Sequence, residues 1–122
     1  MRLFVPYLAH STNVGTRGHW RTRKREVDAC TLLTRNAAQK AALAPCRGLV
    51  DLTFTPQLGK GARFRDTSNY SLNAKYLEDA LVAAGILRDD NQRHVRRITL
   101  EPPYRNSQAP TGTWIEIQEV AP

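Results

Sequence analysis

The chain has 122 residues, of which 18 are lysine or arginine and 11 are aspartate or glutamate, and 41% of its residues are hydrophobic. This length and composition are typical of one soluble globular domain with a modest core, and they exclude two independent enzyme domains, a disordered chain and a fibrous one. The longest uninterrupted apolar run, residues 80–87, is far shorter than the roughly 18 residues of a membrane-spanning helix. We therefore expect a single domain over residues 1–122, no membrane partner and a cytoplasmic location.

The first half of the chain predicts a strand, a loop, a long helix and a second strand. Residues 2–8 form a short strand that Pro6 places at an edge or a bulge, and a polar loop follows. Residues 22–43 contain no glycine or proline, and apolar side chains recur at helical spacing, which predicts one long helix. Residues 50–54 alternate between apolar and polar side chains and predict a half-buried strand that ends at Pro56.

The second half predicts another helix and two more strands. Residues 57–65 form a flexible basic loop, and the apolar stripe within residues 68–84 predicts a helix for which Gly85 is a natural C-cap. Residues 95–101 and 114–120 are the last two strands. The predicted order is β-α-β-α-β-β. The fold class is therefore α/β in the broad sense (α+β), with a single-layer mixed sheet of about four strands and two main helices.

Basic side chains are concentrated in the first half of the chain. Residues 1–65 hold 12 basic and 3 acidic side chains, whereas residues 66–122 hold 6 and 8. Arginine outnumbers lysine 14 to 4, which suits phosphate because a guanidinium holds two phosphate oxygens at once. A net positive charge alone is explained more simply by a solvated basic surface than by a binding site. Basic residues also flank the acidic positions described next, and this arrangement favours a binding site for a polyanion. The side chains expected to contact DNA are Arg17, His19, Trp20, Arg21, Arg23, Lys24 and Arg25, with Lys60, Arg63 and Arg65 as a second group.

Acidic residues border the second predicted helix. Asp66 precedes it, Asp79 lies within it one turn from Lys75, and Asp89 and Asp90 follow it. Two or more carboxylates brought together hold a hard divalent cation such as magnesium, and Lys75 would then stabilise charge developing on a phosphate. Each residue also has a purely structural explanation as a helix cap, an ion pair or a polar turn. The metal hypothesis therefore depends on folding to bring these side chains together.

These residues also carry a resemblance to a known family. The run from Arg65 to Asn69, followed by Lys75, residues 79–81, 84–87, 89–90 and 94–95, resembles the signature of the RusA family of Holliday-junction resolvases, especially its phage-type members. Asn13 and the segment from His19 to Arg21 extend the resemblance over most of the chain. It implies a homodimeric endonuclease of a bacterial or phage-infected cell that depends on magnesium, with manganese as a second candidate ion, and that cuts four-way DNA junctions by paired nicks.

The resemblance also implies roles for individual residues. Asp66 and Asp90 would hold metal, with Asp89 beside them, Lys75 would be catalytic, and Asn69 closes the first motif at the DNA. Ser68 stands where the family often has a second acid. We therefore expect Asp79 or a water to replace the missing ligand, and the number of metal ions stays open.

Further expectations concern base stacking and the competing functions. Trp20 or Tyr70 is expected to stack on an unpaired base at the crossover, with a core or interface role as the alternative for Trp20. Two other functions fit the same residues: a non-catalytic basic DNA-binding protein, and a nuclease that prefers flaps or branched RNA.

Overall fold

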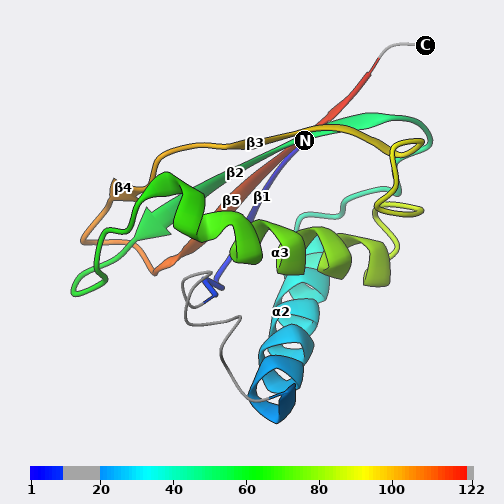
Figure 1. The fold of residues 1–122 in the computed structure, drawn as a ribbon. Coiled ribbons are helices and arrows are strands. Elements are labelled where there is room, and N and C mark those ends of the chain that lie inside the picture. The colour runs from blue at the N-terminus through cyan, green and yellow to red at the C-terminus, as the bar shows by residue number, and fades with distance from the viewer. Residues whose placement is uncertain (10–19, 121–122) are drawn as a thin grey trace.

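A five-stranded mixed sheet and two α-helices make up the fold in the computed structural model, which describes residues 1–9 and 20–120 (Figure 1). This arrangement confirms the predicted α+β class, with five strands in place of about four. The elements in chain order are β1 (Arg2–Val5), α2 (Trp20–Lys40), β2 (Val50–Leu58), the 3₁₀ helix η1 (Thr67–Tyr70), α3 (Ser71–Ala83), β3 (Val95–Leu100), β4 (Tyr104–Arg105) and β5 (Gly112–Glu119). Within the described residues, no helix is both long and apolar enough to cross a membrane.

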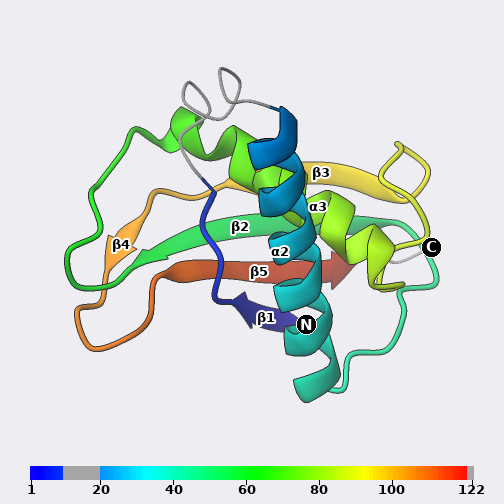
Figure 2. The same cartoon turned by 90° about the horizontal axis from the view of Figure 1, so that it is seen from below.

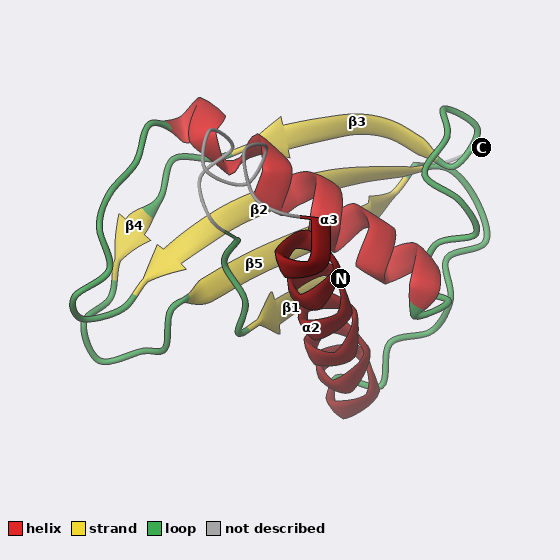
Figure 3. Ribbon diagram, turned by 60° about the horizontal axis from the view of Figure 1, so that its bottom comes forward, coloured by secondary structure: helices red, strands yellow, loops and turns green. Residues whose placement is uncertain are grey.

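The sheet has the strand order β1-β5-β2-β3 and combines both kinds of pairing. β5 runs antiparallel to β1 on one side and to β2 on the other, whereas β2 and β3 run parallel. Parallel neighbours need a long connection, and here it contains η1 and α3. Both helices lie on the same side of the sheet, and α2 crosses α3 (Figures 2 and 3).

Strand β2 does not end at Pro56 as predicted but continues to Leu58. β5 pairs with β2 along this stretch, whereas on the opposite side the pairing with β3 ends at Phe54 and the pairing with β4 begins at Gln57. Pro56 therefore lies at a gap between two partner strands, where its missing N–H breaks no ladder. The two-residue strand β4 is absent from the prediction, and the predicted loop over residues 57–65 begins only after Leu58.

The ends of the other elements also differ from the prediction. β1 stops at Val5, directly before Pro6. The long helix covers Trp20–Lys40 rather than residues 22–43, and Ala42 has a positive φ of 52° beyond its end. The second helix begins as one 3₁₀ turn and continues as α3. Gly85 follows its C-cap with a φ of +79°, which confirms the predicted role of this glycine because left-handed backbone favours glycine.

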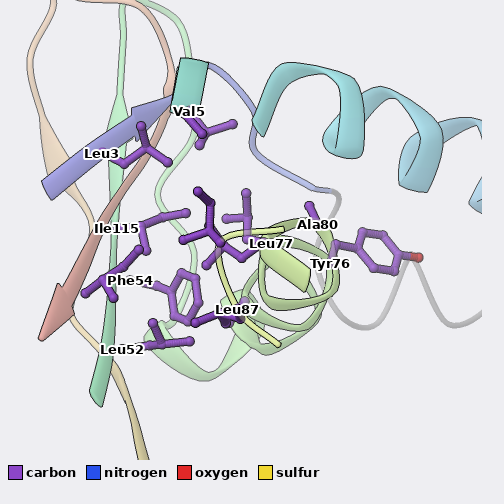
Figure 4. Close-up of a cluster of buried hydrophobic side chains, with 14 of the residues drawn as sticks. Leu3, Val5, Leu52, Phe54, Tyr76, Leu77, Ala80, Leu87 and Ile115 are labelled. Atoms are coloured by element: carbon purple, nitrogen blue, oxygen red, sulfur yellow. The ribbon is translucent and has the colours of Figure 1, made fainter. Parts of the chain in front are cut away.

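The core lies between the sheet and the helices (Figure 4). Leu52, Phe54 and Ile115 point from the sheet toward Leu77 of α3, and all four side chains are buried. α3 also packs against α2, so the described contacts bury it from more than one direction. As a result its buried residues extend well beyond one stripe and include Asn73, Ala74, Tyr76, Leu77, Glu78, Ala80 and Leu81.

Candidate functional site

Three carboxyl groups and one ammonium meet where α3 faces the turn that follows it. One carboxylate oxygen from each of Glu78, Asp79 and Asp90 lies within 4.8 Å of the other two. The Lys75 Nζ lies 2.7 Å from Asp90 Oδ2, 3.0 Å from Asp79 Oδ1 and 3.8 Å from Glu78 Oε1. α3 places Lys75, Glu78 and Asp79 together, because residues three and four positions apart share one face of a helix. Of the predicted site residues, the fold thus brings together Lys75, Asp79 and Asp90.

The turn after α3 holds Asp90 in this position. The carboxylate of Asp89 accepts hydrogen bonds from the backbone N–H of Asp90 at 2.8 Å and from the Asn91 side chain at 3.2 Å. The Asn91 carbonyl in turn accepts from the N–H groups of His94 and Val95. Asp89 therefore shapes the turn, whereas Asp90 is the residue of this pair that reaches Lys75.

The electrostatics of the group follow from these contacts. Hydrogen bonds to Asp90 and Asp79 raise the pKa of Lys75, and the bond from Lys75 lowers the pKa of Asp90. Burial raises the pKa of Glu78, a residue that is only 5% exposed. A single ammonium therefore faces three carboxyl groups, one of which is desolvated, and this is a set of oxygen donors that suits a hard divalent cation.

Glu78 belongs to this group but is not among the residues predicted from the sequence. It lies three residues after Lys75, and helical spacing would have placed it beside that side chain. No pattern in the sequence showed that a glutamate next to the apolar stripe is buried, because its burial depends on how α3 packs within the tertiary structure.

Asp66 does not belong to this group within the described residues. It precedes η1, is exposed, and its carbonyl accepts a hydrogen bond from the Asn69 N–H. Lys75 lies nine positions further along this helical segment, which corresponds to about 15 Å. The fold of one chain therefore leaves Asp66 apart from Asp90. Ser68 is an exposed residue of η1 and lies near Asp66 in the chain.

The basic residues predicted to contact DNA fall in several places. Arg17 and His19 lie outside the described residues. The first turns of α2 carry an exposed group, and Lys60 and Arg63 are exposed on the loop between β2 and η1. The first turn of α2 contains no acidic residue, although the partial positive charge of a helix N-terminus favours one. The five predicted residues of this turn and the next are all exposed, namely Trp20, Arg21, Arg23, Lys24 and Arg25.

Arg65 and Tyr70 contact each other beside the chain that follows β1, and the burial of Tyr70 contradicts its predicted stacking role. The Arg65 guanidinium donates a hydrogen bond to the Ala9 carbonyl at 3.0 Å and lies 5.0 Å from the centroid of the Tyr70 ring. Tyr70 is only 2% exposed, so it has no surface on which a base could stack. The buried Asn73 accepts from the Ala9 N–H and donates to Thr113, both at 3.0 Å, and this link between β5, α3 and the chain after β1 was not predicted.

The pH dependence of stability provides a test of the buried Glu78 carboxyl. Because burial raises its pKa above the ordinary 4.5, the native state holds this proton more tightly than the unfolded state. The free energy of unfolding therefore falls as the pH rises above the ordinary pKa of Glu78 and this carboxyl ionises. Glu78→Gln has no group to ionise and does not show this loss of stability. In EDTA, we expect the Tm of Glu78→Gln relative to the unmodified protein to increase between pH 4 and pH 7.5. The exposed Glu101→Gln is the control, and parallel Tm curves for all three proteins would contradict the assignment.

Comparison with family models, curated proteins and solved structures gives no match to this chain.

Proposed function

We propose that this chain is an endonuclease that depends on a divalent metal ion, cuts branched DNA such as a four-way junction, and acts as a homodimer. The observation that carries the proposal is the group formed by Glu78, Asp79 and Asp90 around the Lys75 ammonium. The resemblance to the RusA family supports the choice of reaction and substrate. A DNA substrate also supports a cytoplasmic location in a bacterial or phage-infected cell.

The residues of the group suit a magnesium or manganese ion. Hard cations prefer oxygen ligands, and three close carboxyl groups supply them while leaving coordination positions for water and phosphate. A bound ion would lower the pKa of a coordinated water and stabilise negative charge on the phosphate oxygens. Glu78, Asp79 and Asp90 are the residues that would hold it.

The chain's own cations then have distinct tasks. Lys75 would bind a phosphate oxygen and orient the scissile group if the carboxylates that it now contacts held a metal ion instead. The exposed basic side chains at the start of α2 would grip the backbone, which positions DNA without reading its sequence. A four-way junction has two-fold symmetry, so a two-fold dimer presents equivalent sites to opposed strands.

Magnesium-dependent nicking is the direct test of this function. The purified chain is incubated with a labelled four-way junction, with magnesium and separately with EDTA, and the products are separated on a denaturing gel. We expect paired nicks in magnesium and no cleavage in EDTA. Flap and duplex substrates at the same salt concentration separate junction cleavage from a broader nuclease activity, because the basic surface makes every DNA affinity depend on salt.

One observation favours a non-catalytic DNA-binding protein as the second candidate. Lys75 already pairs with Asp79 and Asp90 at 3.0 and 2.7 Å, so these acids are partly neutralised without any metal. Such a protein would retard junction DNA on a native gel and would never nick it, whichever ion is added.

A further inference from the structure

We propose that Phe64 and Arg105 form a stacking platform for unpaired nucleotides. This inference rests on the proposed function only in taking nucleic acid as the ligand. It adds recognition of exposed bases to the backbone contacts made by basic side chains. The sequence predicts base stacking for Trp20 or Tyr70; Tyr70 is buried, whereas Trp20 is exposed.

The first observation is the exposure and charge around Phe64. The residue is 57% exposed, and the Arg105 guanidinium carbon lies 5.0 Å from the centroid of its ring. Single exposed apolar side chains are ordinary on protein surfaces. Phe64 differs because it shares its loop with the exposed Lys60 and Arg63, so three cations accompany one accessible aromatic ring.

The second observation is that the loop is braced. The Arg105 guanidinium donates hydrogen bonds to the carbonyls of Gly59 and Ala62. The Gly59 N–H donates to Thr111 Oγ1 at 2.9 Å, and a Cβ on Gly59 would lie 2.7 Å from the Ala109 carbonyl oxygen. The loop that the sequence predicts to be flexible is therefore tied closely to the segments around β4. A ring held in place in this way loses little conformational freedom when a ligand binds.

The chemistry of the platform favours unpaired bases. Bases stack on aromatic rings and on guanidinium planes, and this contact tolerates any sequence because every base has a π-face. The flanking cations Lys60 and Arg63 would hold the adjacent phosphates. A paired base is enclosed by its neighbours in the duplex, whereas single strands and the centre of a branched DNA offer bases with open faces. An uncharged apolar partner gains nothing from the Arg105 guanidinium beside the ring or from the exposed cations of the same loop.

The platform is spatially separate from the acidic group. The loop with Phe64 precedes η1 and lies beside β4, whereas Asp90 belongs to the turn that follows α3 (Figures 1 and 2). Base stacking can therefore be tested without any measurement of cleavage.

The test measures binding of a fluorescent single-stranded oligothymidine by anisotropy, in EDTA and at one fixed salt concentration. We expect Phe64→Ala to bind about tenfold to a hundredfold more weakly than the unmodified protein, because loss of one stacked base has an effect of this size. Phe64→Trp should retain the affinity. Leu32→Ala is the matched control, since Leu32 is equally exposed on α2 at 56% and should bind as the unmodified protein does. For a blunt duplex of the same length, the affinities of Phe64→Ala and the unmodified protein should differ by less than about twofold, because the bases of a duplex are not open to stacking.

Three results would overturn the proposal: equal binding of the single strand by Phe64→Ala and the unmodified protein, an equal loss on single strand and duplex, or no single-strand binding by the unmodified protein. Absence of magnesium-dependent cleavage would contradict the proposed nuclease and leave these binding results unchanged. The failures of the two proposals are therefore distinguishable.

Discussion

Replacing Asp90 with asparagine is expected to lower the rate of magnesium-dependent junction cleavage by at least about 100-fold, the size of effect that follows loss of one preorganised group that stabilises charge in a transition state. Asparagine has nearly the same shape but no negative charge, so the remaining carboxyl groups would hold a divalent ion more weakly. The same change removes the negative charge of the closest partner of Lys75, which lies at 2.7 Å. The measurement is single-turnover cleavage of a labelled four-way junction, with the protein in excess.

Asp51→Asn is the matched control for this prediction. Asp51 is also a partly exposed aspartate in an ion pair, with Arg96 Nη2 at 2.6 Å, but it lies outside the acidic group. We expect Asp51→Asn to cleave at the unmodified rate. Both variants should keep a Tm close to that of the unmodified protein, because ion pairs at the surface contribute little to stability. Cleavage by Asp90→Asn at the unmodified rate would contradict the assignment.

The sequence predicts the elements whose side chains repeat with a clear period. The long helix, the strands β2 and β5, and the turn at Gly85 all have local signals, and each appears in the structure. Strand β4 has no such signal, because Tyr104–Arg105 is a strand only through its pairing with Gln57 and Leu58. Pro56 indicated the end of a strand for a sound local reason, yet the position of its neighbours removes the penalty.

The candidate site shows the same division between local and long-range information. Lys75 and Asp79 were predicted to be neighbours because they are four residues apart on one helix, and they are in contact. Whether Asp66 or Glu78 joins Asp90 depends on tertiary packing, which spacing along the chain does not describe. In the structure it is Glu78 that lies beside Asp90, and its burial follows from the packing around α3. The predicted partnership of Asp66 with Asp90 is not formed within one described chain.

Truncation of Phe54 to alanine is expected to lower the free energy of unfolding by about 3–5 kcal/mol. Phe54 is 2% exposed, lies on the central strand β2 between Ile115 and Leu100 of its neighbours, and points toward α3 (Figure 4). Its loss leaves a cavity that a close-packed interior fills only in part. Small domains have a total stability of about 5–15 kcal/mol, so the Tm should fall by roughly 10–20 °C in a calorimetric or circular dichroism melt.

Phe64→Ala removes the same atoms from the surface and is the control for this loss. Because Phe64 is exposed, its truncation should change the free energy of unfolding by no more than about 0.5 kcal/mol. A Phe54→Ala variant that melts with Phe64→Ala would contradict the placement of Phe54 in the core. The comparison is also a control for the stacking experiment. If Phe64→Ala has a normal Tm, it is folded, and its weaker binding of single strands is then due to the loss of the aromatic ring.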